Sequence, residues 1–241
     1  MTERSLSFSR GAQEYAASRP GYPATAVDWA VPAGTRSVLD LAAGTGKLTA
    51  ALVARGLEVT AVEPSDQMRA ILAADLPTVR VLPGTAEATG LPDDAVDAVT
   101  VAQAWHWFDA AAATREVARV LRPGGHLTVL WNVRDDHEPW VAEFTRIVHR
   151  GDASPVHYRA PDLGAAFTRP EVLEVRWAQP VTTAGLRTLA GTRSFLLTMP
   201  DDQREARLAE VDRLAATHPS LAGRPQVPLP YVTHAWRATR L

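Results

Sequence analysis

Two closely spaced glycines mark the segment of this 241-residue chain that is best built to hold a ligand. Residues 40–49 read DLAAGTGKLT, which places Gly44 and Gly46 between a predicted strand and a predicted helix. Glycine adopts left-handed backbone conformations at no steric cost and lets a ligand approach the main chain closely. The pattern therefore predicts a tight turn that binds a small molecule through its backbone.

Two common nucleotide-binding loops fit this turn badly. In a GxxxxGK[ST] phosphate loop, Leu41 would replace the first glycine and Leu48 the hydroxyl residue that binds magnesium, so this loop is excluded. In a GxGxxG dinucleotide fingerprint, Thr49 would replace the third glycine. The second match is poor, and a nicotinamide-dependent oxidoreductase stays open as an alternative.

A second group of chemical side chains is the run QAWHWF at residues 103–108. His106 can exchange a proton near neutral pH, since an unperturbed histidine has a pKa of about 6.5. We expect His106 to serve as a base or to orient a substrate, with a purely structural histidine as the alternative. Trp105 and Trp107 are suited to line a dry pocket and to face a cation, or else to pack against the neighbouring helix.

The elements that must position these residues alternate between strands and helices. The predicted strands are residues 37–43, 58–64, 78–84, 95–104 and 126–133, and the predicted helices are about 24–31, 47–56, 65–75 and 112–121, the last stopped by residues 123–125. Such alternation predicts βαβ units, a parallel sheet and helices on both faces. Ligands of such sheets bind at the carboxyl ends of the strands, so the glycine turn, Glu63 and residues 103–108 should meet at one edge.

The regular alternation of predicted strands and helices ends after Val133. Helices are predicted at 138–150, 183–199 and 201–218, and strands at 171–182 and 226–238. Two prolines in the last strand suggest an edge position or the approach to one. We predict one domain over residues 1–241, with an N-terminal lid segment (1–23), a cofactor-binding core (36–133), and substrate-capping helices with C-terminal strands (134–241).

Composition excludes several classes of function. The absence of cysteine rules out disulfides, thiolate nucleophiles and zinc sites with cysteine ligands. Neither an HExxH nor a GxSxG motif occurs, so we expect no metal and no serine triad. A net charge of −2 argues against general nucleic-acid binding, and charges or prolines interrupt every apolar run before membrane length. A cytoplasmic monomer or homodimer with no membrane contact is the expectation.

In chain order, the segments resemble the motifs of class I S-adenosylmethionine-dependent methyltransferases. The first motif of that family is an acid followed by xGxGTG, and DLAAGTG departs from it at Ala43, where many members carry a glycine. The matching segments that follow are AVEPSDQM, GTAEATGLP, VDAVTVAQAWHWF and EVARVLRPGGHLTVLW, so the resemblance covers residues 36–133. YAASRPGYP and PYVTHAWRA are similar to a bacterial branch of small-molecule methyltransferases.

The resemblance implies a fold and an activity. The fold would be a Rossmann-like, mostly parallel seven-stranded sheet with helices on both faces, an N-terminal lid and helical insertions after strand five. The activity would be methyl transfer from S-adenosylmethionine by direct displacement, leaving S-adenosylhomocysteine. The signature of amino-group methyltransferases, Asn/Asp-Pro-Pro-aromatic, is absent, which favours a small acceptor and above all O-methylation. A non-catalytic protein that binds S-adenosylmethionine is the alternative.

The resemblance also assigns roles to residues. Glu63 would accept hydrogen bonds from both ribose hydroxyls, Met68 would cover the adenine, and Glu87 would read its edge; a solvated glutamate, a core methionine and a surface glutamate are the respective alternatives. Asp40 would orient the glycine turn and reach the cofactor's amino group through water. The predicted cofactor site is Asp40, Ala42, Ala43, Gly44, Gly46, Leu48, Glu63, Pro64, Met68, Thr85, Ala86, Glu87, Ala102, Gln103 and Trp105. The predicted substrate site is Tyr15, Arg19, Tyr22 and Trp107, where Arg19 would clamp a carboxylate or else lie exposed.

Overall fold

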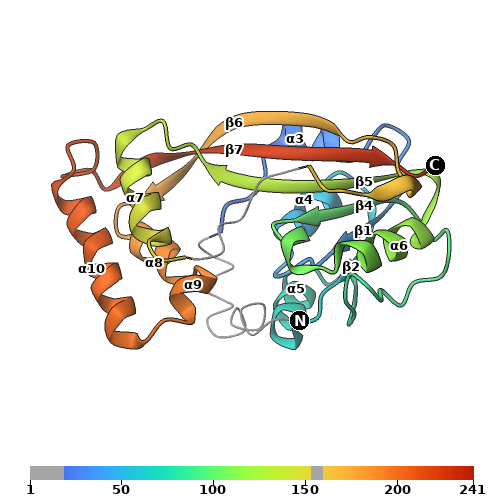
Figure 1. The fold of residues 1–241 in the computed structure, drawn as a ribbon, viewed down its shortest axis with the longest axis horizontal. Coiled ribbons are helices and arrows are strands. Elements are labelled where there is room, and N and C mark those ends of the chain that lie inside the picture. The colour runs from blue at the N-terminus through green and yellow to red at the C-terminus, as the bar shows by residue number, and fades with distance from the viewer. Residues whose placement is uncertain (1–18, 153–159) are drawn as a thin grey trace.

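The computed structural model describes residues 19–152 and 160–241, and its frame is one seven-stranded sheet (Figure 1). The strand order is β3-β2-β1-β4-β5-β7-β6, in which β7 runs antiparallel to both of its neighbours. The strands are β1 Ser37–Leu41, β2 Glu58–Val62, β3 Arg80–Leu82, β4 Val96–Ala102, β5 Leu121–Arg134, β6 Glu171–Thr182 and β7 Gln226–Thr239. The prediction of a mostly parallel, seven-stranded sheet is confirmed.

Helices cover both faces of the sheet, as the βαβ pattern predicted. They are α3 Ala24–Ala30, α4 Lys47–Val53, α5 Asp66–Asp75, α6 Ala110–Val120, α7 Pro139–His149, α8 Gly185–Gly191, α9 Ser194–Leu197 and α10 Asp201–Thr217, with 3₁₀ turns η2 Trp105–Trp107 and η3 Gly164–Ala166. Val27 of α3 and Leu52 of α4 share one apolar cluster with strand residues, whereas Val117 of α6 belongs to another. No described helix is long and apolar enough to cross a membrane.

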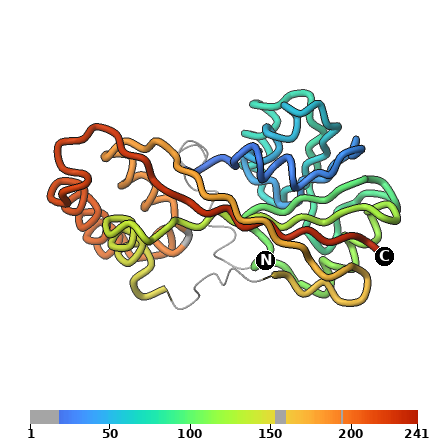
Figure 2. The backbone as a smooth tube through the Cα atoms, turned by 90° about the horizontal axis from the view of Figure 1, so that it is seen from above, coloured from blue at the N-terminus to red at the C-terminus, as the bar shows by residue number. Residues whose placement is uncertain are grey.

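Three strands, β5, β6 and β7, are much longer than the rest and reach beyond the parallel part of the sheet. β5 and β7 each have 14 residues, and their far ends carry helices α7 to α10, which we call the helical lobe (Figures 1 and 2). The lobe has a hydrophobic cluster of its own, which includes Phe144, Leu186 and Val211 together with Tyr231 from β7. One continuous sheet therefore joins two apolar cores.

The structure departs from the predicted elements at three places. Helix α6 ends at Val120, and residues 123–125 lie instead in β5, in an irregular stretch where the partners of β4 shift from Leu121 to His126. The predicted helix over 183–199 is divided into α8 and α9. β7 is an internal strand, but its two prolines precede Tyr231, the first residue that pairs with β5, so their missing N–H groups leave no gap in that ladder.

Candidate active site

The turn after β1 requires glycine at two positions. Gly44 has a φ of +58° and Gly46 a φ of +86°, both in the left-handed region. A Cβ on Gly46 would lie 2.9 Å from Cγ of Leu72 in α5, whereas a Cβ on Gly44 would meet only the sulfur of Met68, at 3.9 Å. Close helix packing thus explains Gly46, and the side of the turn at Gly44 leaves room for a ligand.

Asp40 lies beneath this turn and holds it. Its side-chain oxygens accept hydrogen bonds from Oγ1 of Thr49 in α4 (2.6 Å) and Oγ1 of Thr100 in β4 (3.1 Å). Burial raises the pKa of Asp40 to about 6. These contacts support the predicted role of orienting the turn, and both oxygens face protein hydroxyls, so we assign Asp40 no direct ligand contact.

Glu63 connects the end of β2 to the glycine turn. Its two carboxylate oxygens accept hydrogen bonds from the backbone N–H groups of Gly44 and Ser65, each at 2.9 Å. Arg69 donates to the main-chain carbonyl of Glu63 at 2.7 Å, and burial raises the pKa of the Glu63 side chain. A carboxylate has about four acceptor positions, so one position on each oxygen remains for a donor such as a ribose hydroxyl. This residue therefore fits the cofactor role.

The backbone is strained at the ends of two adjacent strands. Ala42 follows β1 with a φ of +55°, and Gln103 follows β4 with a φ of +61°. β1 and β4 pair in parallel, so both residues lie at the same edge of the sheet. A non-glycine residue in the left-handed region costs on the order of 1 kcal/mol or more and is concentrated at functional sites. The strain marks this edge independently of any motif.

His106 lies in an aromatic group on η2. Its ring centroid is 4.2 Å from that of Trp107 and 5.1 Å from that of Trp131 in β5. The surrounding protein withdraws water from the ring and lowers the pKa of His106 to about 4, although part of the side chain stays exposed. This pKa lies below the ordinary histidine value near 6.5 on which the expectation for His106 rested. Trp131 was missed because an apolar strand gives no sign of which residues its ends will meet.

Several predicted cofactor residues lie with their side chains in the core. Leu48, Met68 and Ala86 are 2%, 6% and 3% exposed, so a ligand could reach them mainly through the backbone or, at Met68, the sulfur. Glu87 instead accepts a hydrogen bond from the N–H of Asp109 at 3.0 Å, which joins the turn after β3 to the start of α6. Three other positions, Ala43, Pro64 and Thr85, lie in the connections after β1, β2 and β3. Ala102 is the last residue of β4, and Trp105 is the first residue of η2.

Residues 19–22 cross between the two cores. Arg19 donates to the carbonyl of Thr192 in the helical lobe at 2.8 Å, and the carbonyl of Gly21 accepts from Asn132 of β5 at 2.8 Å. Tyr22 packs on the cluster of α3 and α4. Arg19 thus has a structural contact that the sequence did not predict, whereas Tyr15 lies outside the described residues.

Asn132 belongs to a buried polar chain that the sequence analysis missed. Its Oδ1 accepts from Oγ1 of Thr233 at 2.6 Å, and that hydroxyl accepts from the indole of Trp177 at 2.8 Å. The chain therefore ties β5, β7 and β6 to Gly21. One signal was available, namely a polar residue inside the apolar strand HLTVLWNV.

One group among the described residues has the composition of a metal site. Asp135, Asp136 and His137 lie together after β5. Asp135 contacts both His137 and Arg176, and the other two residues are exposed. We assign no metal to this group.

Comparison with known proteins shows the family to which the chain belongs. Residues 39–129 match a family described as a methyltransferase domain. Over 237 residues the chain is 48% identical to an uncharacterized methyltransferase of Mycobacterium tuberculosis, a match that covers 98% of this chain and 97% of the relative. This chain belongs to the class I S-adenosylmethionine-dependent methyltransferases.

Other relatives agree with this methyltransferase assignment. An uncharacterized methyltransferase-like protein of Schizosaccharomyces pombe is 34% identical over 243 residues, covering 97% of this methyltransferase and 95% of the relative. The solved structure of a proposed type II methyltransferase from Anaeromyxobacter dehalogenans superposes with a TM-score of 0.69 and 28% identity, over 92% of this chain and 97% of that one. The matches extend over the helical lobe as well as the core.

Proposed function

We propose that this methyltransferase binds S-adenosylmethionine at the carboxyl edge of β1, β2 and β4 and methylates a small-molecule acceptor, in the first place on oxygen. The observation that carries the proposal is the 2.9 Å contact between the Gly44 amide and the Glu63 carboxylate. It fixes the acceptor atoms of Glu63 next to the open side of the glycine turn.

The cofactor's ribose would be held by Glu63, through the one acceptor position that remains on each carboxylate oxygen. The cofactor's remaining groups would lie along the turn at Gly44 and beside the sulfur of Met68. When bound, S-adenosylmethionine supplies a methyl carbon on a sulfonium centre. Because Asp40 and Glu63 hold the turn from below and from the side, little reorganisation would accompany binding.

His106 is proposed to take the proton from the acceptor. The acceptor oxygen forms a bond to the methyl carbon while the carbon–sulfur bond breaks and its electron pair stays on sulfur. A hydroxyl acceptor becomes strongly acidic as this bond forms, so an imidazole with a pKa of about 4 can still accept the proton late in the step. At pH 7 the imidazole is neutral and needs no prior deprotonation.

A small acceptor is favoured by the surroundings of His106. The aromatic rings of Trp107 and Trp131 flank it, and residues 19–22 are bound between the helical lobe and β5. Rings at these positions would pack against a small acceptor held beside His106. The net charge of −2 also lacks the basic surplus of a nucleic-acid enzyme.

The test is cofactor affinity by calorimetry on Glu63→Ala. The change removes two charge-assisted hydrogen bonds worth about 1.5–3 kcal/mol each, so the affinity for S-adenosylmethionine should fall at least about tenfold. Glu58→Ala, at the exposed amino end of the same strand, should leave the affinity unchanged. Equal affinities of the two variants would refute the ribose assignment, and a screen of acceptors for release of S-adenosylhomocysteine tests turnover.

A further inference from the structure

Five basic side chains gather where the end of β5, the end of α7 and the turn between α8 and α9 meet. We call them the basic cluster, and they are Arg19, Arg134, His149, Arg193 and Arg204. They come from distant parts of the chain, so the five residues do not form a motif in the sequence. None of the roles proposed above for the cofactor or for His106 uses them.

The turn between α8 and α9 collects three of these side chains. Arg19 donates to the carbonyl of Thr192 at 2.8 Å, and Arg204 of α10 reaches the carbonyl of Gly191 at 3.5 Å. Arg193 is the next residue of the same turn. Three guanidinium-bearing residues therefore converge on three consecutive positions.

Arg134 and His149 complete the cluster from the other side. Arg134 is 7% exposed, donates to Oγ1 of Thr145 at 2.8 Å and lies with its Cζ 5.0 Å from the centre of the Phe144 ring. Burial and the charges of Arg134 and Arg193 lower the pKa of His149 to about 4. The positive fields of the two arginines thus overlap at His149.

Two members of the basic cluster have no acidic partner within the described ranges 19–152 and 160–241. Asp152 lies 3.7 Å from His149, but neither Arg193 nor Arg204 forms an ion pair with any residue of those ranges. Each has a buried Nε that makes no hydrogen bond there. Arg187, on the outer side of the same lobe, instead pairs with acids of α10. A buried guanidinium nitrogen without a hydrogen-bond partner is costly, and a bound anion would relieve that cost.

The tyrosine paired with Arg134 adds a polar group to this region. Tyr231 of β7 is opposite Arg134 of β5, and it is 2% exposed. Its hydroxyl makes no hydrogen bond with any described residue. A buried hydroxyl without a hydrogen-bond partner is costly, so it is a second sign, independent of charge, that a polar ligand belongs here.

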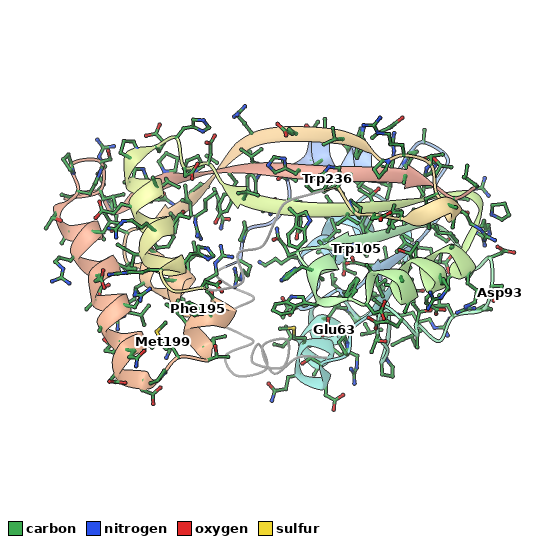
Figure 3. All side chains as sticks on the ribbon, in the orientation of Figure 1. Glu63, Asp93, Trp105, Phe195, Met199 and Trp236 are labelled. Carbon is green, nitrogen blue, oxygen red and sulfur yellow. The ribbon has the colours of Figure 1, made fainter. Side chains whose placement is uncertain are left out.

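We infer that the basic cluster binds an anionic group, a carboxylate or a phosphate, on the methyl acceptor, an inference that rests on the proposed function. β5 links the two ends of such an acceptor. Trp131 contacts His106, and Arg134 follows three residues later, about 10 Å further along the strand and on its opposite face. In Figure 3, Phe195 of α9 lies on the side of the helical lobe that faces Glu63 and Trp105. The nucleophile would lie near His106 and the anionic end at the lobe.

Anion binding by the full chain tests this inference. The variant is Arg193→Gln, and the matched control is Arg146→Gln, an exposed arginine of α7 that lies 3.7 Å from Glu143. The probes are inorganic phosphate and succinate, titrated calorimetrically at constant ionic strength. Wild type and Arg146→Gln should bind at least one probe saturably, and Arg193→Gln should bind it at least about tenfold more weakly. Preference for one probe identifies the group as phosphate or carboxylate.

Several results would overturn the inference. They are the absence of saturable binding in wild type, equal binding by Arg193→Gln, or equal weakening in Arg146→Gln. A kinetic arm uses acceptors offered as acid and as primary amide. Arg193→Gln should raise KM for the acid at least about tenfold, leave kcat within about threefold and leave the amide unaffected.

The proposed function is tested separately, by a second measurement on the same protein preparations. Affinity for S-adenosylmethionine reports on the cofactor site, since Arg193 lies in the helical lobe and Glu63 at the end of β2. Loss of cofactor binding in wild type would refute the proposed function. Normal cofactor binding with no dependence of anion binding on Arg193 would refute the basic cluster alone.

Discussion

At the scale of single residues, burial decides the chemistry of the site. The protein around Asp40, Glu63 and His106 disfavours the charged form of each, raising the pKa of the two acids and lowering that of the histidine. For Glu63, backbone N–H groups oppose this effect and hold the carboxylate in place. For His106, no compensating acid contributes, so the imidazole is neutral over the physiological range.

The rate of methyl transfer should follow the titration of His106. A base must be unprotonated, and a pKa of about 4 means that protonation removes activity as the pH falls through 4, while the rate stays flat between about pH 6 and 8. His106→Asn should lower kcat by about 10²–10⁴ with cofactor affinity unchanged. Steady-state kinetics across pH measure both effects.

A matched histidine supplies the control for this experiment. His126→Asn changes a histidine of β5 that pairs with Thr239 rather than with the site. It should keep the wild-type rate. A wild-type rate that climbs between pH 6 and 7, or a fully active His106→Asn, would remove His106 from the role of base.

At the scale of elements, β5 does more than complete the sheet. Its residues Trp131, Asn132 and Arg134 reach His106, the N-terminal segment and the basic cluster respectively. Beyond its last pair with β4, at Leu130, the strand keeps β7 as its partner. One strand thus connects the core with the helical lobe.

The glycine turn depends on the packing of two helices. Gly46→Ala would force a Cβ to within 2.9 Å of Leu72, besides the cost of a left-handed alanine. Gly56→Ala has a similar φ, +75°, but no atom within 4 Å, so it bears the conformational cost alone. In denaturant unfolding, the free energy of unfolding of Gly46→Ala should be about 1–3 kcal/mol lower than that of Gly56→Ala. Only Gly46→Ala should lose affinity for the cofactor. Equal stabilities of the two variants would show that the Leu72 side chain can move aside at no energetic cost.

At the scale of the whole molecule, the apolar clusters of the core and the cluster of the helical lobe share one sheet. Leu186 lies in the cluster of the helical lobe, and Leu52 in that of α3 and α4, both fully buried. Because β5, β6 and β7 run through both regions without a break, we predict one cooperative unfolding transition.

Calorimetry on Leu186→Ala and Leu52→Ala tests this unity. Each change costs about 2–5 kcal/mol, which should lower the midpoint of the same transition by roughly 5–15 °C. Saturating S-adenosylmethionine should raise that midpoint in both variants. Two separate transitions, with the cofactor moving only one of them, would show that the lobe unfolds as an independent domain.

Local patterns in the sequence determined the parallel part of the sheet and the glycine turn. These features depend on periodicity and backbone freedom. The matched motifs also located Glu63, because a strand end is fixed by the strand itself. The role of each residue toward a ligand stays a prediction.

Tertiary structure alone decided the features made by residues distant in the chain. The pKa of His106 depends on protein that folds around it, and its contact with Trp131 joins β5 to η2. The basic cluster brings together side chains from five separate segments. The sequences of the long ends of β5 and β7 do not differ in composition from those of ordinary strands. Only the pairing of these ends shows that they carry a second apolar core. The burial of a side chain and the electrostatic potential at it are set by the residues around it in space. The spacing of residues along the sequence does not show which residues those are.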